Sequence, residues 1–196
     1  MSRGLVNPRT PECEVNPLFS DRWSPRAFLS SPLTEAQREA LFEAARWTPS
    51  CYNDQPWFFL YAESEADRAL FVKPLVEKNR QWAKAAPLLI YVLARRHFSG
   101  SERENRHAAF DAGAAWMALA LQARQLGLYA HAMAGFDRDL AAELLKIPLD
   151  RYDILAAVAV GERGEADQLP ADLAALEKPN ERQALPSVVQ AGRFKG

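Results

Sequence analysis

Residues 87–94 read Pro-Leu-Leu-Ile-Tyr-Val-Leu-Ala, an uninterrupted apolar run rich in strand-forming residues. Because such a run has no polar face, it predicts a central β-strand buried on both sides. A second apolar segment, residues 104–126, predicts a long helix that ends at Gly127, a residue typical of helix C-termini. The middle of this helix, Ala-Gly-Ala-Ala-Trp-Met-Ala-Leu-Ala-Leu at residues 112–121, is apolar nearly all round. It should therefore be buried on most sides, either by the core of its own chain or by a second subunit.

The elements around this strand and helix are marked by capping and turn residues. Thr34 and Gln37 form a capping-box pattern, which predicts a helix that begins there and ends before Pro49. Asp137 is expected to cap another helix that reaches Lys146. Composition predicts a helix at residues 66–76 and strands at residues 56–62, 129–134 and 154–160. This mixture of strands and long helices predicts an α+β (or α/β) class with helices packed against one sheet.

The composition indicates one folded domain in water, because 48% of the 196 residues are apolar and 25% are charged. A formal net charge of −1 gives no general attraction to nucleic acid or to an anionic membrane, so a few placed residues must hold any bound anion. The longest apolar run is far shorter than the roughly 20 residues that a membrane span needs. The N-terminus lacks the apolar core of a signal peptide, so we expect a cytoplasmic protein. Two cysteines and three scattered histidines predict neither a disulfide framework nor a metal site.

Both ends of the chain are predicted to be irregular. Residues 1–17 carry three prolines and read as an extended arm. The polar residues 164–196 form a C-terminal extension in which several prolines prevent a continuous helix. Val188, Val189 and Phe194 indicate that this extension docks on another surface.

The first segment that could carry chemistry is Arg22-Trp23-Ser24-Pro25-Arg26. Two guanidinium groups around a serine hydroxyl can surround a dianionic phosphate, because guanidinium forks pair with phosphate oxygens in a bidentate manner. On charge spacing alone, however, two arginines this close are more typical of solvated surface.

The second segment is Pro49-Ser50-Cys51-Tyr52-Asn53-Asp54-Gln55-Pro56-Trp57, between a predicted helix and a predicted strand. Asn and Gln side chains each offer a donor and an acceptor, which suits the mixed polar edge of a heterocycle. Taken alone, the same residues are better explained as a helix-to-strand turn.

The order of these two segments relative to three later segments favours a functional interpretation. These are Ala-Gly-Phe-Asp at residues 134–137, Val160-Gly161 at the end of the last strand, and Arg182. From about residue 17 to the end, the order and spacing resemble those of the nitroreductase family of flavin mononucleotide (FMN) enzymes.

The resemblance implies an α+β fold of three layers, α/β/α, with a mainly antiparallel central sheet flanked by helices. It implies that residues 1–196 form a single FMN-binding domain, that two chains form an intertwined homodimer, and that FMN lies at their interface. Residues 164–196 would then dock on the partner subunit. The implied activity is a ping-pong reaction in which NADH or NADPH is the reductant and a nitroaromatic, quinone or similar small molecule is the acceptor.

The resemblance also assigns roles to residues. Arg22, Ser24 and Arg182 would hold the FMN phosphate, and Arg26 would lie beside the N1/O2 side of the isoalloxazine. Asn53 would come from the partner chain, and the backbone at residues 134–135 would face N5. No side chain is needed as a catalyst, because the flavin supplies the chemistry. The full set expected around the cofactor is Arg22, Trp23, Ser24, Arg26, Pro49, Ser50, Cys51, Asn53, Gln55, Met133, Ala134, Gly135 and Arg182.

Two departures from the family pattern keep other functions open. Ala134 stands where many relatives carry an acidic residue, and Asn180 stands where some carry a lysine. A flavin-binding storage or sensor protein is therefore one alternative. A relative with other flavin chemistry, such as reductive dehalogenation or flavin consumption, is another.

Overall fold

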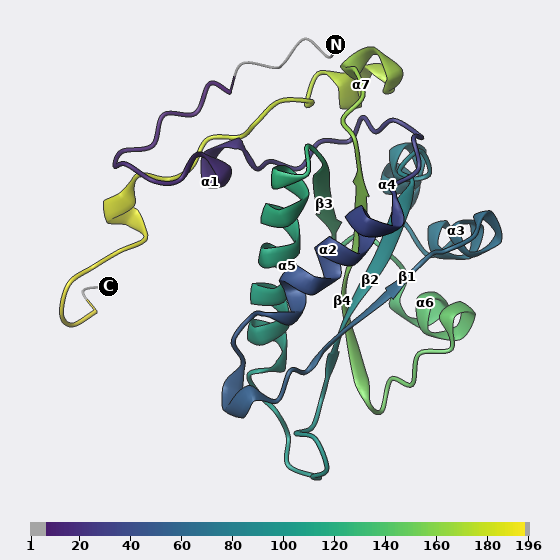
Figure 1. Ribbon diagram of the computed structural model, residues 1–196, viewed down its shortest axis with the longest axis vertical. Helices are drawn as coiled ribbons and strands as arrows, with labels where there is room; N and C mark the ends of the chain where they lie inside the picture. Colours follow the sequence, from purple (N-terminus) through teal and green to yellow (C-terminus); the bar gives the residue numbers. More distant parts are fainter. Residues whose placement is uncertain (1–6, 195–196) are drawn as a thin grey trace.

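The computed structural model describes residues 7–194, so the first six residues of the expected arm and the last two of the extension lie outside the described part (Figure 1). Its centre is a four-stranded sheet in the order β1-β2-β4-β3, in which all neighbouring strands are antiparallel. The strands are β1 (Trp57–Tyr61), β2 (Leu88–Arg95), β3 (Tyr129–Met133) and β4 (Tyr152–Gly161). The prediction that the 87–94 run forms a central strand is confirmed, since β2 pairs on both edges and seven of its eight residues are buried.

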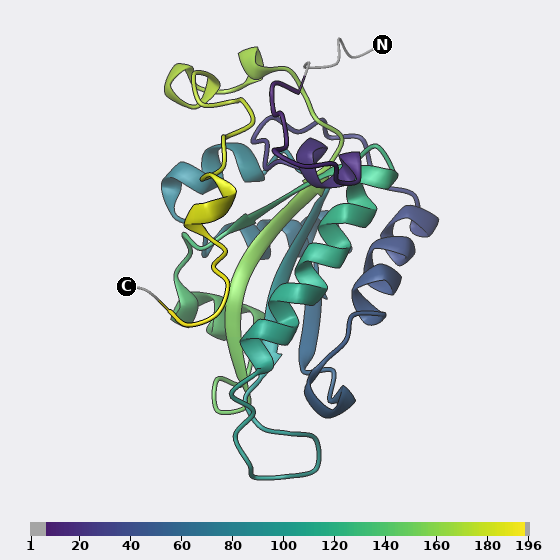
Figure 2. The same ribbon diagram turned by 90° about the vertical axis from the view of Figure 1, so that its left-hand side faces the viewer.

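One face of the sheet is covered by α2 (Glu35–Arg46) and α5 (Ala108–Gln125), which Figure 2 shows side by side. Small residues of α5, among them Ala112 and Ala115, are fully buried and let the helix lie close to the sheet. The helix begins later than the sequence predicted, because Glu104 pairs with His97 in an isolated β-bridge and the Asn105 amide donates to the Arg96 carbonyl at 2.8 Å.

The opposite face carries α3 (Glu65–Val72), α4 (Glu77–Ala83) and α6 (Arg138–Leu145) (Figure 1). The predicted C-terminal boundary of the helix at residues 66–76 is wrong, since α3 ends at Val72. Pro74 explains the stop, because proline offers no N–H to continue the helical hydrogen bonds. No helix was predicted at α4, whose N-cap residue Val76 makes no side-chain capping hydrogen bond. With helices on both faces of the sheet, the α/β/α layering is confirmed.

The predicted caps hold at three positions. Thr34 accepts a hydrogen bond from the Gln37 amide at 3.2 Å, and the Gln37 side chain accepts from the Thr34 amide at 2.9 Å. Asp137 accepts from the Leu140 amide at 2.9 Å. Gly127 follows α5 with a φ of 78°, a backbone conformation that favours glycine.

The two terminal segments run side by side at one end of the molecule (Figure 1). The Leu185 amide donates to the Glu12 carboxylate at 3.1 Å, across 173 positions in the sequence. Regular structure here is limited to short pieces: α1 (Pro17–Asp21), η2 (Ala166–Gln168), α7 (Ala171–Ala174) and η3 (Leu185–Ser187). Within the described residues, no helix is both long and apolar enough to cross a membrane.

Candidate functional site

A pocket of about 270 Å³ lies where the N-terminal arm, the 22–26 segment, β3 and the C-terminal extension meet. We call it the anion pocket, because five of its lining side chains are basic and none is acidic. The lining residues are Arg9, Arg22, Trp23, Ser24, Arg26, His131, Leu176, Lys178, Asn180 and Arg182.

The positive charges of the anion pocket are not neutralised by the chain itself. Within the described residues, no ion pair involves any of its basic side chains. The pKa of Arg22 is lowered by burial of its guanidinium and by the nearby positive charges of Arg182 and Arg9. Since like charges in partial burial repel one another, a bound dianion would relieve the repulsion. The residues present therefore fit a phosphate group.

Backbone pairing holds the 22–29 segment beside the end of β4. The Leu29 amide donates to the Glu162 carbonyl at 2.9 Å, and the Gly164 amide donates to the Ala27 carbonyl at 2.9 Å. Trp23 is buried and meets the ring of Tyr129 edge-on, with ring centroids 5.9 Å apart. These contacts fix the backbone that carries the two predicted arginines.

A buried carboxylate that the sequence did not single out reinforces this segment. Glu177 is 5% exposed and accepts hydrogen bonds from the backbone amides of Arg26 and Ala27 at 2.9–3.0 Å. Its partners lie about 150 positions away in the sequence, so no local pattern could have identified it.

His131 forms one wall of the anion pocket. Its Nδ1 lies 2.7 Å from the Pro25 carbonyl oxygen, which can only accept, so Nδ1 carries the proton and Nε2 can accept a hydrogen bond. Burial lowers the pKa of His131 to about 4, an effect that the Pro25 hydrogen bond opposes and that the positive charges of Arg26 and Arg22 strengthen. Its ring lies on that of buried Trp82, with centroids 4.5 Å apart. The imidazole is therefore neutral at physiological pH.

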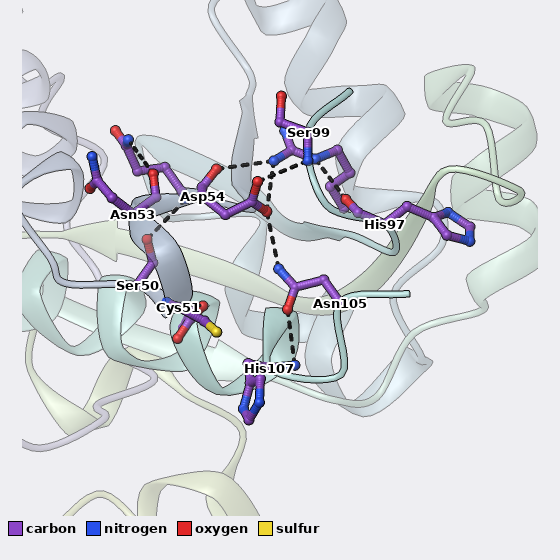
Figure 3. Close-up of polar contacts among 11 residues, drawn as sticks. Ser50, Cys51, Asn53, Asp54, His97, Ser99, Asn105 and His107 are labelled. Atoms are coloured by element: carbon purple, nitrogen blue, oxygen red, sulfur yellow. Dashed lines mark hydrogen bonds and ion pairs between the residues drawn. The ribbon is translucent and has the colours of Figure 1, made fainter. Parts of the chain in front are cut away.

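The Pro49–Gln55 residues form a strained loop at η1 (Cys51–Asn53), shown in Figure 3. Tyr52, Asn53 and Gln55 have φ values of 54°, 55° and 50°, in the left-handed region that non-glycine residues rarely adopt. Such strain persists only where surrounding contacts hold it, and it is common at ligand sites. Here the Ser50 hydroxyl accepts from the Gln55 amide at 2.9 Å.

Asp54, which the sequence analysis did not select, anchors this loop to residues 95–105 (Figure 3). Its carboxylate accepts from the Ser99 amide at 2.8 Å and from Asn105 Nδ2 at 3.0 Å, and it lies 2.9 Å from Arg95 Nη2. Burial alone would raise the pKa of Asp54, but the hydrogen bonds from Ser99 and Arg95 hold it below its ordinary value. The carboxylate is therefore an ionised structural anchor of the loop.

Cys51 lies at the edge of a smaller cleft of about 210 Å³. Its amide donates to Asp111 on α5 at 3.0 Å, which supports a structural role for that buried carboxylate. The other lining residues are Tyr52, Phe98, Arg103, Glu104, Arg106 and His107.

The third predicted group lies at the end of β3. Met133 is 3% exposed and packs in the hydrophobic core, whereas Ala134 is exposed. The Gly135 carbonyl accepts from the Val76 amide at 3.1 Å and from Asn79 Nδ2 at 3.0 Å. A Cβ at position 135 would lie 2.8 Å from Asn79 Nδ2, so a larger residue there would require the Asn79 side chain to shift.

Within one chain these groups do not form a single site. The anion pocket lies at the sheet end where β3 begins, near the pair Tyr129 and Gly161. The strained loop precedes Trp57 at the other end, where Trp57 pairs with Ala94. Arg22, Trp23, Ser24, Arg26 and Arg182 come together, but Asn53 and its neighbours lie apart from them.

Comparisons with known proteins agree with this architecture. The model of the nitroreductase family matches residues 20–162. A Streptomyces coelicolor protein with the provisional name NADH dehydrogenase/NAD(P)H nitroreductase is 30% identical over 167 residues, which cover 75% of this chain and 84% of that one. A Mycolicibacterium smegmatis protein of 15.4 kDa, without a described function, is 41% identical over 123 residues, 61% of this chain and 80% of that one.

Solved structures extend the match to nearly the whole chain. The crystal structure of an oxidoreductase containing FMN is 44% identical, with a TM-score of 0.92 over 98% of this chain and 99% of that one. A structure from Desulfovibrio desulfuricans, described provisionally as a nitroreductase in complex with FMN, is 23% identical. Its TM-score of 0.71 over 93% of this chain and 100% of that one shows the shared fold.

Proposed function

This chain belongs to the nitroreductase family, and we propose that it is an FMN-dependent oxidoreductase that takes electrons from NADH or NADPH. The observation that carries the proposal is the anion pocket, where basic side chains converge without an acidic partner in the described residues. The 44% identical structure, which is an oxidoreductase containing FMN, supports the same cofactor.

In this proposal Arg22, Ser24 and Arg182 hold the phosphate, and Arg26 faces the N1/O2 side of the flavin. When bound, FMN supplies two-electron redox chemistry, taking electrons from NADH or NADPH and passing them to a nitroaromatic, quinone or similar acceptor in ping-pong order. The chain contributes binding, orientation and positive charge, and no side chain is required as a nucleophile.

A homodimer is part of the proposal, because the predicted flavin ligands are divided between two ends of one chain. If the strained loop of a second copy lies over the anion pocket, Asn53 joins Arg22 in one site. Exposed apolar side chains offer surface for such a partner: Tyr52 is 80% exposed, Phe110 of α5 is 79% exposed and Phe194 of the C-terminal extension is 92% exposed. We propose that residues 1–196 form one domain whose extension, residues 164–196, docks on the partner subunit.

The direct test is spectroscopic. The purified protein should be yellow or take up added FMN, its flavin absorbance should bleach with NADH or NADPH without oxygen, and a quinone should restore the colour. Arg22→Ala should lose FMN while remaining folded by circular dichroism. A yellow protein that neither nicotinamide bleaches would indicate a flavin-storage or sensor protein, and a protein that binds no FMN would contradict the proposal.

A panel of nitroaromatics and quinones under each nicotinamide then identifies the preferred pair. Parallel initial-rate lines at varied concentrations of both substrates are expected for a ping-pong order. Intersecting lines would contradict that order without affecting the assignment of FMN.

A further inference from the structure

The Arg9 guanidinium in the N-terminal arm is held in place by three backbone carbonyls. Its Nε donates to the Asn180 carbonyl at 2.7 Å. Its Nη1 donates to the carbonyls of Ser20 at 3.0 Å and Arg22 at 2.8 Å. One side chain thus ties together the arm, the start of the 22–26 segment and the C-terminal extension.

These hydrogen bonds fix the group without neutralising it. Carbonyl oxygens carry no formal charge, and Arg9 forms no ion pair in the part of the chain that the structure describes. Burial and the positive charge of Arg182 lower the pKa of Arg9, while Glu181 acts in the opposite direction. Within the described residues, Arg9 therefore keeps a positive charge without an ion-paired carboxylate in the wall of the anion pocket.

The remaining nitrogen of the guanidinium is available to a ligand. Nε and Nη1 make all the hydrogen bonds of the Arg9 side chain within residues 7–194, so the two N–H donors of Nη2 are unused. A donor that is already fixed loses little conformational freedom when an anion binds. An exposed arginine without such anchors would lose more.

We propose that Arg9 is a phosphate-binding residue of the cofactor site, whose Nη2 donates to the FMN phosphate beside Arg22 and Arg182. The inference rests on the proposed function and adds a ligand from outside residues 20–162, the part that the family model matches. It also gives residue 180 a role. Asn180 adds no charge to the pocket, but its backbone carbonyl holds the arginine that does.

The experiment compares two flavins that differ only in the phosphate. Apo-protein is titrated with FMN and with riboflavin, and the quenching of flavin fluorescence gives the dissociation constants of wild type and Arg9→Gln. Loss of one charge-assisted hydrogen bond should weaken FMN binding about tenfold to a hundredfold and leave riboflavin binding unchanged. Arg68→Gln on α3 removes the same charge away from the pocket and should change neither constant.

Equal weakening of both flavins would overturn the proposal, because Arg9 would then only position the arm. Unchanged FMN binding would overturn it as well. If wild type binds FMN no more tightly than riboflavin, the proposed phosphate site itself fails, and this outcome is recognised before any variant is measured.

A measurement on wild type covers the case in which Arg9→Gln does not fold. Phenylglyoxal modifies accessible guanidinium groups, and mass spectrometry reports the modification of Arg9. FMN and inorganic phosphate should protect Arg9, whereas riboflavin should not. Equal protection by riboflavin, or none by FMN, would overturn the proposal.

Discussion

Arg26 is the residue whose charge should have the largest effect on the reduction potential of a bound flavin. Two-electron reduction places negative charge at N1/O2, so a fixed cation there stabilises the reduced form. If about 2 kcal/mol of a charge-assisted hydrogen bond favours reduced flavin, Arg26→Gln should lower the midpoint potential by roughly 40 mV. Potentiometric titration of the bound flavin measures this shift. Arg163 does not line the anion pocket, so Arg163→Gln is the control and should leave the potential unchanged. An unchanged potential in Arg26→Gln would show that Arg26 does not lie beside the flavin ring.

His131 should make the stability of the protein depend on pH. Its pKa is about 4 in the folded chain, against an ordinary value of 6.5. Between these values the unfolded chain takes up a proton that the folded chain does not, so stability is lost as the pH falls from about 6.5 to about 4. The loss attributable to this group reaches about 3 kcal/mol below pH 4, at 1.36 kcal/mol per pKa unit.

Urea unfolding of wild type and His131→Gln across this pH range isolates the effect, since carboxylates contribute equally to both. The difference in free energy of unfolding should change as the pH falls. His107 is exposed, so His107→Gln serves as the control, and its free energy of unfolding should change with pH as that of wild type does. A constant difference for His131→Gln would show that the imidazole is not held neutral.

At the scale of elements, Glu177 connects the end of α7 to the segment that carries Arg26. Its carboxylate is 5% exposed and accepts backbone hydrogen bonds from Arg26 and Ala27. Glu177→Gln keeps the shape but loses the charge and turns one acceptor into a donor. We expect the free energy of unfolding to fall by about 2 kcal/mol, and chemical denaturation measures it. Glu143→Gln, on the exposed side of α6, should change stability by less than about 0.5 kcal/mol.

The same contact shows what could and could not be predicted from the sequence. Local signals identified the caps at Thr34 and Asp137 and the buried strand β2, because their causes lie within a few residues. The motif order identified the family and the cluster of Arg22, Ser24 and Arg182. Arg9 and Glu177 were missed, since the contact of Arg9 with Asn180 and that of Glu177 with Arg26 each span about 150 or more positions, and neither residue lies in a recognisable local pattern.

At the scale of the whole molecule, the predicted flavin ligands are divided between two ends of the chain, so two defective variants should complement each other in a mixed dimer. In a shared site, Arg22 of one copy and Asn53 of the other serve the same flavin. Arg22→Ala removes a cation of the anion pocket. Asn53→Gly removes the amide while tolerating the φ of 55° at that position. Each variant alone should lose FMN, because both sites of the proposed homodimer would carry the same defect.

Mixed dimers of the two variants separate the shared site from a site within one chain. In a mixed dimer one site combines both defects, whereas the other has an intact Arg22 from one copy and an intact Asn53 from the other. Refolding the variants together, with a different affinity tag on each, should therefore give a doubly tagged species that binds about one FMN per dimer. Each variant refolded alone is the control. If the doubly tagged species binds no FMN, the two residues do not act across the interface. Because one chain holds these residues at opposite ends of its sheet, recovery of half the sites would assign the homodimer and the cofactor position in one measurement.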